Sequence, residues 1–329
     1  MKRRKLLQDG TTASEIGLGC MSFAGFYGAT DEKTSHETLS YCVDHGLDFM
    51  DTSNVYGNGV SETMIGNFVR KTRAKLIIAT KGGIVRDGRS DKRFDNSKPY
   101  LRVNLEDSLK RLAVDCVDLY YIHRRDPDIP VEEVMETLLG FKREGLIKGI
   151  GLSEVSPTTL RRASAVGPVD AVQSEYSLWT RSPEMGLIQA CAELGTAFVP
   201  FSPVGRGLFT DVRPDPTRFT TPDIRMGIPR FQGQNFVDNV ARFEPFRALA
   251  HAMGVSTSAL ALAWVLDQGP HLLPIPGTRH VKHVTHYLEA SDMVLSDEIR
   301  TEIDTLLPIG WAMGDRYNDD QWVGVERYS

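Results

Sequence analysis

Cysteine is scarce in this sequence, and a long apolar run is missing. The four cysteines are Cys20, Cys42, Cys116 and Cys191. They are widely separated, and no pair has a metal-binding spacing, so we expect reduced thiols in a cytoplasmic protein. No stretch approaches the roughly 20 apolar residues of a membrane helix. The basic start at residues 1–7 turns polar at residues 8–10, without the apolar core of a signal peptide.

A large excess of charge of one sign is also missing. The chain has 329 residues with 38 basic and 43 acidic side chains, a net charge of −5. This mild acidity argues against broad binding to nucleic acids or membrane surfaces. Hydrophobic residues make up 41% of the chain and charged residues 25%, which is typical of a globular protein with an ample core. We therefore expect a small-molecule partner, and the sequence leaves the oligomeric state open.

What the sequence does contain is an alternation of short β-rich runs with stretches of helical period. The predicted strands are residues 17–20, 48–52, 76–81, 117–123, 148–153, 171–175, 197–202 and 272–275. The predicted helices are residues 31–45, 61–71, 100–112, 131–144, 157–165, 184–194 and 244–253. Eight strands alternating with helices, and no Pro/Ser-rich linker, predict an α/β fold: a (β/α)8 TIM barrel that forms one domain over residues 1–329.

Two further features complete this predicted fold. An Asp-Gly turn at residues 9–10 lies between short segments, which predicts an N-terminal β-hairpin. Residues 82–99 and 207–240 are too long and irregular to be simple connections, and long loops in compact domains are usually functional or mobile. Both follow predicted strands, so we expect them at the C-terminal face of the barrel, where barrel enzymes carry their active sites.

Polar side chains stand at or just past the ends of three consecutive predicted strands. Asp51 ends the second, with Tyr56 in the Gly/Asn-rich loop after it, while Lys81 and His123 end the third and fourth. A free tyrosine titrates near ~10, and a nearby ammonium lowers that value by favouring the phenolate. The pattern therefore predicts a proton-transfer site in which Asp51 holds Lys81, Lys81 activates Tyr56, and His123 positions a carbonyl.

Each of these residues alone has an ordinary structural explanation. A strand-end Asp is usually a turn or cap residue, a loop Tyr usually packs or lies on the surface, and an isolated Lys or His is commonly solvated or satisfied by a polar neighbour. The interpretation depends on the four together, in order, at one sector of a barrel mouth. A metal site is disfavoured because no His pair with ligand spacing lies near these carboxylates.

The second half of the chain has features that suit a nicotinamide dinucleotide. Ser153 and Gln173 offer a hydroxyl and an amide on the fifth and sixth strands. Residues 202–207 and 276–279 follow the seventh and eighth, where barrels commonly bind phosphate. A Rossmann interpretation of the Gly-x-Gly at residues 17–19 fails, because no third glycine and no convincing helix follow it.

Taken in order, these motifs make the chain resemble the aldo-keto reductase superfamily over nearly its whole length. The motifs are Gly17-Leu18-Gly19-Cys20-Met21, Asp51-Thr52-Ser53 through Tyr56-Gly57, Ala79-Thr80-Lys81, residues 118–123, Ile150-Gly151-Leu152-Ser153, residues 173–176, residues 202–207 and residues 275–279. Residues 123–127 and 314–317 look like the branch that contains perakine reductase and related bacterial and fungal enzymes. The resemblance implies NADPH-dependent reduction of an aldehyde or ketone to an alcohol without a metal, and it leaves NADH possible.

The resemblance also implies roles for individual residues. Tyr56 is expected to be the general acid, with Asp51, Lys81 and His123 completing the catalytic set. The expected cofactor contacts are Cys20, Met21, Asp51, Ser153, Gln173, Phe201, Ser202, Pro203, Val204, Gly205, Arg206, Gly207, Gly277, Thr278, Arg279, His283 and Tyr287. The expected substrate pocket consists of Phe23, Tyr56, His123 and Trp311.

The chain departs from the family pattern at two places. Glu154 stands where many members have an Asn against the nicotinamide carboxamide. At the adenine end, His283, His286 and Tyr287 stand where an Arg and a Glu-Asn pair are usual, while Arg279 keeps NADPH ahead of NADH. Two alternatives to the reductase stay open: a regulatory subunit or sensor that binds the cofactor with little turnover, and an unrelated lyase or isomerase on a barrel.

Overall fold

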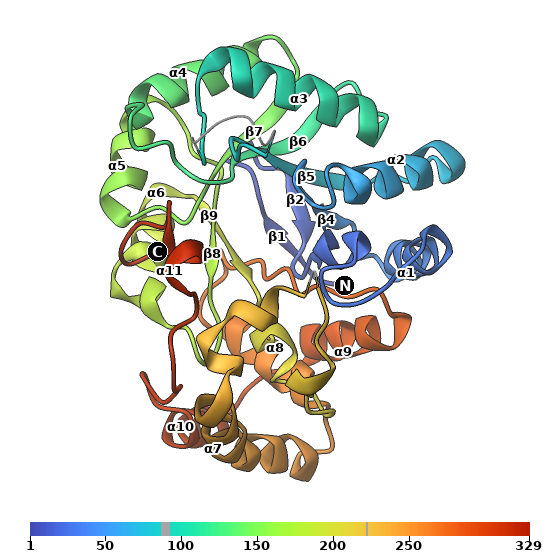
Figure 1. Cartoon of the computed structure of the whole chain (residues 1–329), viewed down its shortest axis with the longest axis vertical. Coiled ribbons are helices and arrows are strands. Elements are labelled where there is room, and N and C mark those ends of the chain that lie inside the picture. The colour runs from blue at the N-terminus through green and yellow to red at the C-terminus, as the bar shows by residue number, and fades with distance from the viewer. Residues whose placement is uncertain (87–92, 222) are drawn as a thin grey trace.

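The computed structural model describes residues 1–86, 93–221 and 223–329. Within these described ranges, seven parallel strands form one sheet in sequence order (Figure 1). They are β3 (Leu18–Gly19), β4 (Phe49–Asp51), β5 (Ile77–Gly82), β6 (Val117–Ile122), β7 (Ile147–Ser153), β8 (Ala171–Glu175) and β9 (Ala197–Phe201). Each pairs with the strand before it, so all of their carboxyl ends lie at one edge.

The eighth predicted strand closes the barrel without forming a regular ladder. Single bridges join Leu272 to Phe198 in β9 and Gly277 to Gly19 in β3. The reason lies in the sequence: Pro274 and Pro276 have no backbone N–H to donate. Their carbonyls still accept hydrogen bonds, from the backbone N–H groups of Gly17 at 2.9 Å and Gly19 at 3.0 Å. The predicted (β/α)8 architecture is therefore confirmed, with an irregular segment in place of the eighth strand.

Helices cover the outside of the sheet, and Figure 1 shows them around the central strands. The helices are α1 (Glu32–Asp44), α2 (Val60–Thr72), α3 (Lys98–Leu112), α4 (Val131–Arg143), α5 (Pro157–Val166), α6 (Leu187–Leu194), α7 (Gly233–Ala252), α8 (Thr257–Asp267), α9 (Val281–Asp292), α10 (Asp297–Leu306) and α11 (Asp319–Trp322). The expected helix at residues 184–194 divides into a 3-10 turn, Ser182–Met185, and α6.

The predicted hairpin forms and covers one end of the barrel. β1 (Arg3–Lys5) pairs antiparallel with β2 (Thr12–Ser14). Leu6 and Leu7 follow β1 and join an apolar cluster inside the barrel that also contains Tyr121 and Ile275. A larger cluster fills the layer between the sheet and the helices. The barrel is thus a packed core, and the space for a ligand lies at the carboxyl ends of the strands.

The prediction of a loop over residues 207–240 is wrong at its C-terminal end, where the structure has a helix. Three short 3-10 turns, Pro216–Arg218, Ile224–Gly227 and Pro229–Phe231, lead into α7, which begins at Gly233. Gly233 at its start and Pro245 inside it weaken the helix signal in the sequence, because both residue types normally disfavour helix interiors. Burial of its apolar side chains, including Phe243 and Phe246, offsets that cost.

Helix α8 was missed for a different reason: its residues from Thr257 to Leu266 are all buried, so it lacks an amphipathic period. Within the described parts of the chain, no single helix is both long and apolar enough to cross a membrane. The pair α7 and α8 meets that test only together, and the two helices are bent by 94° at the break between them.

Candidate active site at the barrel mouth

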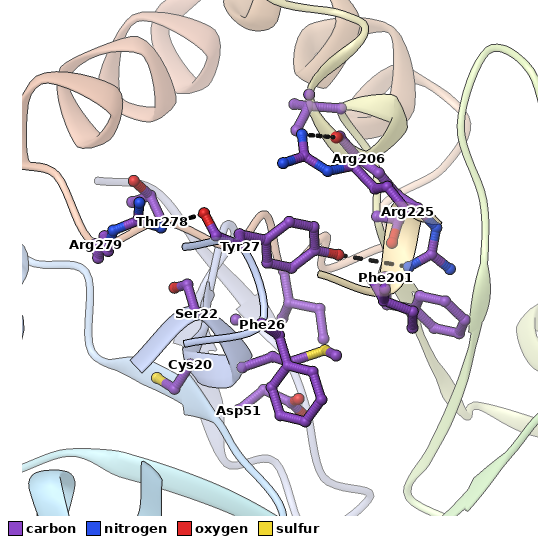
Figure 2. Close-up of a pocket in the computed structure, with 18 of the residues that line it drawn as sticks. Cys20, Ser22, Phe26, Tyr27, Asp51, Phe201, Arg206, Arg225, Thr278 and Arg279 are labelled. Carbon is purple, nitrogen blue, oxygen red and sulfur yellow. Dashed lines mark hydrogen bonds between the residues drawn. The ribbon is translucent and has the colours of Figure 1, made fainter. Parts of the chain in front are cut away.

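A cavity of about 750 Å³ opens at the carboxyl ends of the strands. Figure 2 shows the cavity at the point where side chains of the first loop, such as Tyr27, face those of the last loops. Asp51, Tyr56 and His123 line this cavity. Lys81 lies directly behind them and is fully buried. The four residues predicted from separate strand ends are therefore brought together.

Oxygen atoms and aromatic rings surround the ammonium of Lys81 within the barrel. Its ammonium donates to Asp51 Oδ1 and, at 2.7 Å, to the carbonyl of Thr52. It also lies 5.2 Å from the centre of the Tyr56 ring. Burial lowers the pKa of Lys81, but the Asp51 carboxylate and Tyr56 raise it, and the net pKa is above its usual value. Lys81 is therefore a charged group in a dry site.

Tyr56 is presented by a tight left-handed loop between β4 and α2. Gly57, Asn58 and Gly59 have φ angles of 61°, 52° and 90°, a region that Gly and Asn tolerate best. The Tyr56 ring meets His123 edge-on, with 5.9 Å between ring centres. Burial raises the pKa of the Tyr56 phenol, and the Lys81 charge offsets this only in part. Lys81 lowers the pKa of Tyr56 as expected, but the rise that desolvation causes in this pKa is larger.

His123 follows β6 and is a neutral ring. Its Nδ1 lies 3.1 Å from the hydroxyl of Ser53. Burial and the charges of Lys81 and Arg124 hold the pKa of His123 well below its usual range. When Ser53 donates to Nδ1, the ring proton is on Nε2, which has no hydrogen-bond partner among the described residues. In that tautomer Nε2 is available to donate to a ligand oxygen.

The later strands place their predicted residues around the same cavity, with one unexpected contact. Ser153, Gln173 and Phe201 all line it, from the end of β7, the middle of β8 and the end of β9. The Gln173 amide, however, donates to Asp51 Oδ2 at 2.8 Å. Gln173 therefore orients the carboxylate that holds Lys81, in addition to any contact with a ligand.

Glu154 is turned away from the cavity. It has a left-handed backbone with φ of 56°, and its carboxylate accepts from the Arg316 guanidinium at 2.6 and 3.0 Å. Both side chains are at most 4% exposed. A bidentate pair of this kind fixes geometry as well as charge. The departure from Asn at this position thus ties the C-terminal tail to the end of β7.

The loop after β9 supplies less free charge than its sequence suggests. The Arg206 guanidinium is buried and pairs with Glu175 at 2.7 Å. Ser202 and Arg206 both have φ of 52°, which is strained for residues with a side chain. Of the residues predicted here, Ser202, Val204, Arg206 and Gly207 line the cavity; Pro203 and Gly205 are not among its lining residues. The expected cofactor contacts of Pro203 and Gly205 stay predictions.

Tyr27 spans the cavity between the first and last loops. Arg279 donates to its backbone carbonyl at 2.8 Å, and Arg206 donates to its phenol oxygen at 3.4 Å (Figure 2). The predicted Cys20, Met21, Gly277 and Thr278 line the wall nearby. Tyr27 therefore bridges the two groups of residues that were expected to hold a dinucleotide.

Basic side chains gather at the far end of the cavity. Arg279, His283 and Tyr287, which were predicted as cofactor contacts, line it there with Lys282 and His286. His283 Nδ1 lies 2.8 Å from the Thr278 hydroxyl. Burial and neighbouring positive charge lower the pKa of His283 to about 4, so this ring is neutral at pH 7. Permanent positive charge at this end comes from Arg279 and Lys282.

Two predicted pocket residues do not line the cavity. Phe23 is fully buried in the core, although its neighbours Ser22 and Phe26 are lining residues. Trp311 is 4% exposed, donates to the carbonyl of Leu178 at 2.7 Å, and packs beside other aromatic rings, among them Trp179. The prediction for both is corrected: Phe23 and Trp311 pack the first loop and the tail onto the barrel.

Other lining residues were missed in the sequence. Arg124 directly follows His123, so its position after a strand end was a usable signal. Tyr317 belongs to the C-terminal tail, and nothing in the local sequence distinguishes it from Trp311. Arg225 comes from the long segment after β9, where the sequence indicated a loop without indicating which side chains face inward.

Comparison with known proteins agrees with this geometry. Residues 15–308 match the model of the Aldo/keto reductase family. "Probable aldo-keto reductase 1" of Glycine max is 40% identical, over 99% of this chain and 93% of that protein. "Aldo-keto reductase yakc [NADP(+)]" of Schizosaccharomyces pombe is 38% identical, over 95% and 94%. The structure of glycerol dehydrogenase AKR11B4 from Gluconobacter oxydans superposes with a TM-score of 0.84 at 28% identity, covering 96% and 98% of the two chains. The chain therefore belongs to the aldo/keto reductase family.

Proposed function

We propose that this chain reduces aldehydes or ketones to alcohols with NADPH, and that Tyr56 is the general acid. The observation that carries the proposal is the contact of a buried Lys81–Asp51 pair with the half-buried phenol of Tyr56 at the wall of the cavity. The relative from Schizosaccharomyces pombe, whose name includes NADP(+), supports the choice of cofactor.

The lining residues fit a nicotinamide dinucleotide with a 2′-phosphate. Ser153 and Gln173 offer a hydroxyl and an amide near the catalytic group, and Phe201 offers a flat apolar face. At the other end Arg279 and Lys282 form no ion pair among the described residues, so their charge is available to an anion. We expect the nicotinamide beside Tyr56 and the phosphate beside Arg279. When bound, the reduced nicotinamide supplies the hydride.

The chain's own residues then donate the proton and stabilise the charges that its transfer creates. Tyr56 donates its phenolic proton to the carbonyl oxygen as that oxygen gains negative charge. The Lys81 ammonium stabilises the resulting phenolate, and Asp51 keeps Lys81 charged. Neutral His123 donates from Nε2 to the same oxygen and orients the carbonyl. Burial of Lys81 and Tyr56 strengthens these electrostatic effects, because little water screens them.

Substitution of Tyr56 tests the proposal directly. Tyr56→Phe removes the proton donor and keeps the ring, so we expect a loss of roughly 10²- to 10⁴-fold or more in kcat. The measurement is the decay of NADPH absorbance with aromatic aldehydes, together with NADPH affinity from quenching of protein fluorescence. Tyr41→Phe, on α1 and away from the cavity, is the matched control.

The pattern of results separates the competing functions. Affinity for NADPH that persists in Tyr56→Phe while turnover disappears supports the proposed role. Substantial aldehyde reduction by Tyr56→Phe contradicts it. Tight NADPH binding by the unaltered protein, with no turnover of any carbonyl, favours the regulatory subunit instead, and failure to bind any nicotinamide cofactor favours unrelated barrel chemistry.

A further inference from the structure

Arg124 occupies the cavity wall next to the proposed catalytic group. It lies in the loop after β6, is half-buried, and is a lining residue like its neighbour His123. Its Nη1 donates to the carbonyl of His123 at 2.7 Å and to the Ser153 hydroxyl at 3.2 Å. These two contacts hold the guanidinium between the ends of β6 and β7. Its other N–H groups have no hydrogen-bond partner among the described residues.

The Glu154 carboxylate feels the charge of Arg124 but is bound by Arg316, and Arg124 itself forms no ion pair in the described parts of the chain. No carboxylate lies within ion-pair distance of it there, whereas three nearby arginines have one. Arg125 pairs with Glu326, Arg206 with Glu175, and Arg316 with Glu154. A partly buried charge normally has a partner, because desolvation of an isolated charge is costly. A ligand is a natural source of the missing anion.

The field of Arg124 reaches the reacting groups. Its positive charge lowers the pKa of both Tyr56 and His123, although burial is the larger effect on each. It acts in the same direction on Tyr317, a lining residue of the C-terminal tail. Arg124 is therefore close enough to all three for its charge to be felt where a carbonyl substrate would sit.

The described carboxylates that line the cavity are already bound by other groups, and the lining also includes an apolar surface. The carboxylates among the lining residues are Asp51, which Lys81 and Gln173 hold, and Asp211, which is bound to Thr257 at the start of α8. The nearby lining side chains include Phe26, Val55 and Ile84. A compound with an apolar or aromatic body and one carboxylate matches this combination.

We propose that Arg124 is a specificity-determining residue that selects carbonyl substrates carrying a carboxylate. The inference rests on the proposed reductase function and names the substrate class for the same site. The Arg124 guanidinium binds the carboxylate through its unused N–H groups while Tyr56 and His123 hold the carbonyl oxygen. Planar guanidinium donors match the two oxygens of a carboxylate, and such charge-assisted hydrogen bonds are among the stronger ones in proteins.

The test compares charged and neutral substrates of one shape. The probes are 2-, 3- and 4-carboxybenzaldehyde and their methyl esters, with kcat/KM measured from NADPH oxidation. For the isomer that fits, we expect the acid to be preferred over its ester by roughly 10- to 100-fold, the range that a charge-assisted hydrogen bond supplies. Added salt should reduce this ratio where the pair remains partly exposed.

Variants then assign the preference to one side chain. Arg124→Gln should bring the acid-to-ester ratio close to one, and Arg124→Lys should restore part of it, since a charge without the planar donor pair remains. Arg161→Gln is the matched control: it removes a guanidinium that pairs with Glu193 and does not line the cavity, and it should leave the ratio in place. NADPH affinity is measured for each variant.

Several outcomes would overturn the inference. Equal kcat/KM for every acid and its ester in the unaltered protein contradicts it and leaves the reductase function standing. An acid preference that persists in Arg124→Gln also contradicts it. A large loss of NADPH affinity in Arg124→Gln, with the ratio unchanged, assigns Arg124 to the cofactor instead. No turnover of either class contradicts the proposed function as well.

Discussion

Lys81 carries two opposing effects at the scale of a single residue. Its burial disfavours its own charge, while Asp51 favours it, and the charged form prevails. That charge in turn favours the phenolate of Tyr56, while desolvation of Tyr56 favours the phenol, and here desolvation prevails. A tyrosine that is protonated at neutral pH and has an ammonium beside it is suited to giving up its proton when an oxyanion forms.

The pH dependence follows from the raised pKa of Tyr56. Reduction needs the phenol, so kcat/KM for a carbonyl should hold through neutral pH and fall as pH rises through the Tyr56 pKa. Oxidation of the alcohol needs the phenolate, so it should rise over the same alkaline range. The check is a pair of pH profiles, one in each direction. A reduction profile that falls at acidic or neutral pH would contradict Tyr56 as the acid.

Removing the Lys81 ammonium should move the alkaline limb of these pH profiles. Lys81 lowers the pKa of Tyr56 more than Asp51 raises it, so Asp51→Asn/Lys81→Met should shift the limb of alcohol oxidation to higher pH. The double change is used because Lys81→Met alone leaves a buried carboxylate unpaired, which typically costs about 3–5 kcal/mol. An unmoved limb would mean that Lys81 does not tune Tyr56.

At the scale of secondary-structure elements, polar contacts attach the C-terminal tail to the barrel. Arg316 pairs with Glu154 after β7, and Glu326 accepts from Arg125 and from the backbone N–H of Ser156 at the start of α5. These contacts reach across the barrel mouth and bring Tyr317 to the cavity. The tail therefore contributes a wall of the site through polar contacts, while Trp311 anchors it through apolar ones.

Two helical glycines allow a controlled test of helix packing. A Cβ on Gly66 in α2 would lie 1.9 Å from the backbone carbonyl oxygen of Arg111 in α3, an atom that cannot move independently. We expect Gly66→Ala to lower the free energy of unfolding by about 1–3 kcal/mol or more. Gly140 in α4 has only the end of Arg143 nearby, at 3.9 Å.

Gly140→Ala is the matched control for Gly66→Ala. It should raise the free energy of unfolding by about 0.5–1 kcal/mol, because Ala favours the helix over Gly. Both values come from urea or thermal unfolding followed by circular dichroism. If Gly66→Ala proved neutral, α2 and α3 would not be in backbone contact as the structure has them.

The whole molecule combines a negative net charge with a cationic end of the cavity. The chain carries −5, but Arg279 and Lys282 are free of ion pairs among the described residues. His283 is neutral at pH 7 and contributes hydrogen bonding instead of charge. A dianionic 2′-phosphate would meet mainly Arg279 and Lys282, so electrostatics at this end should decide between NADPH and NADH.

Cofactor-linked stability tests that expectation. A ligand at 100 times its Kd stabilises a protein by about 2.7 kcal/mol, so both cofactors at equal concentration report their relative affinity as a rise in Tm. NADPH should raise Tm more than NADH, and the difference should shrink with salt. Arg279→Gln should reduce it, whereas Arg161→Gln, in an exposed pair with Glu193, should not. Equal shifts for both cofactors would contradict this assignment.

Much of the fold follows from local sequence, because alternation of β-rich runs and helical periods is a local property. That pattern predicted the order of the strands and the parallel barrel, and the Asp-Gly turn at residues 9–10 predicted the hairpin. It failed where the local signal was weak or misleading. Helix α8 has no polar face, and α7 contains Pro245. The irregular segment that closes the barrel contains Pro274 and Pro276. In each case tertiary burial, or hydrogen bonds from the N–H donors of a neighbouring strand, made up for what the local sequence lacks.

The sequence by itself determined that Asp51, Lys81 and His123 meet, because parallel strands carry their C-terminal residues to one rim. Only the tertiary structure decided which other side chains join them. Glu154 and Arg316 lie 162 residues apart, and nothing near either one indicates their pairing. The chain path alone places Tyr317 at the cavity and Trp311 in the core. Strand ends are positioned by regular geometry, whereas loops and tails are positioned by contacts made across the whole fold.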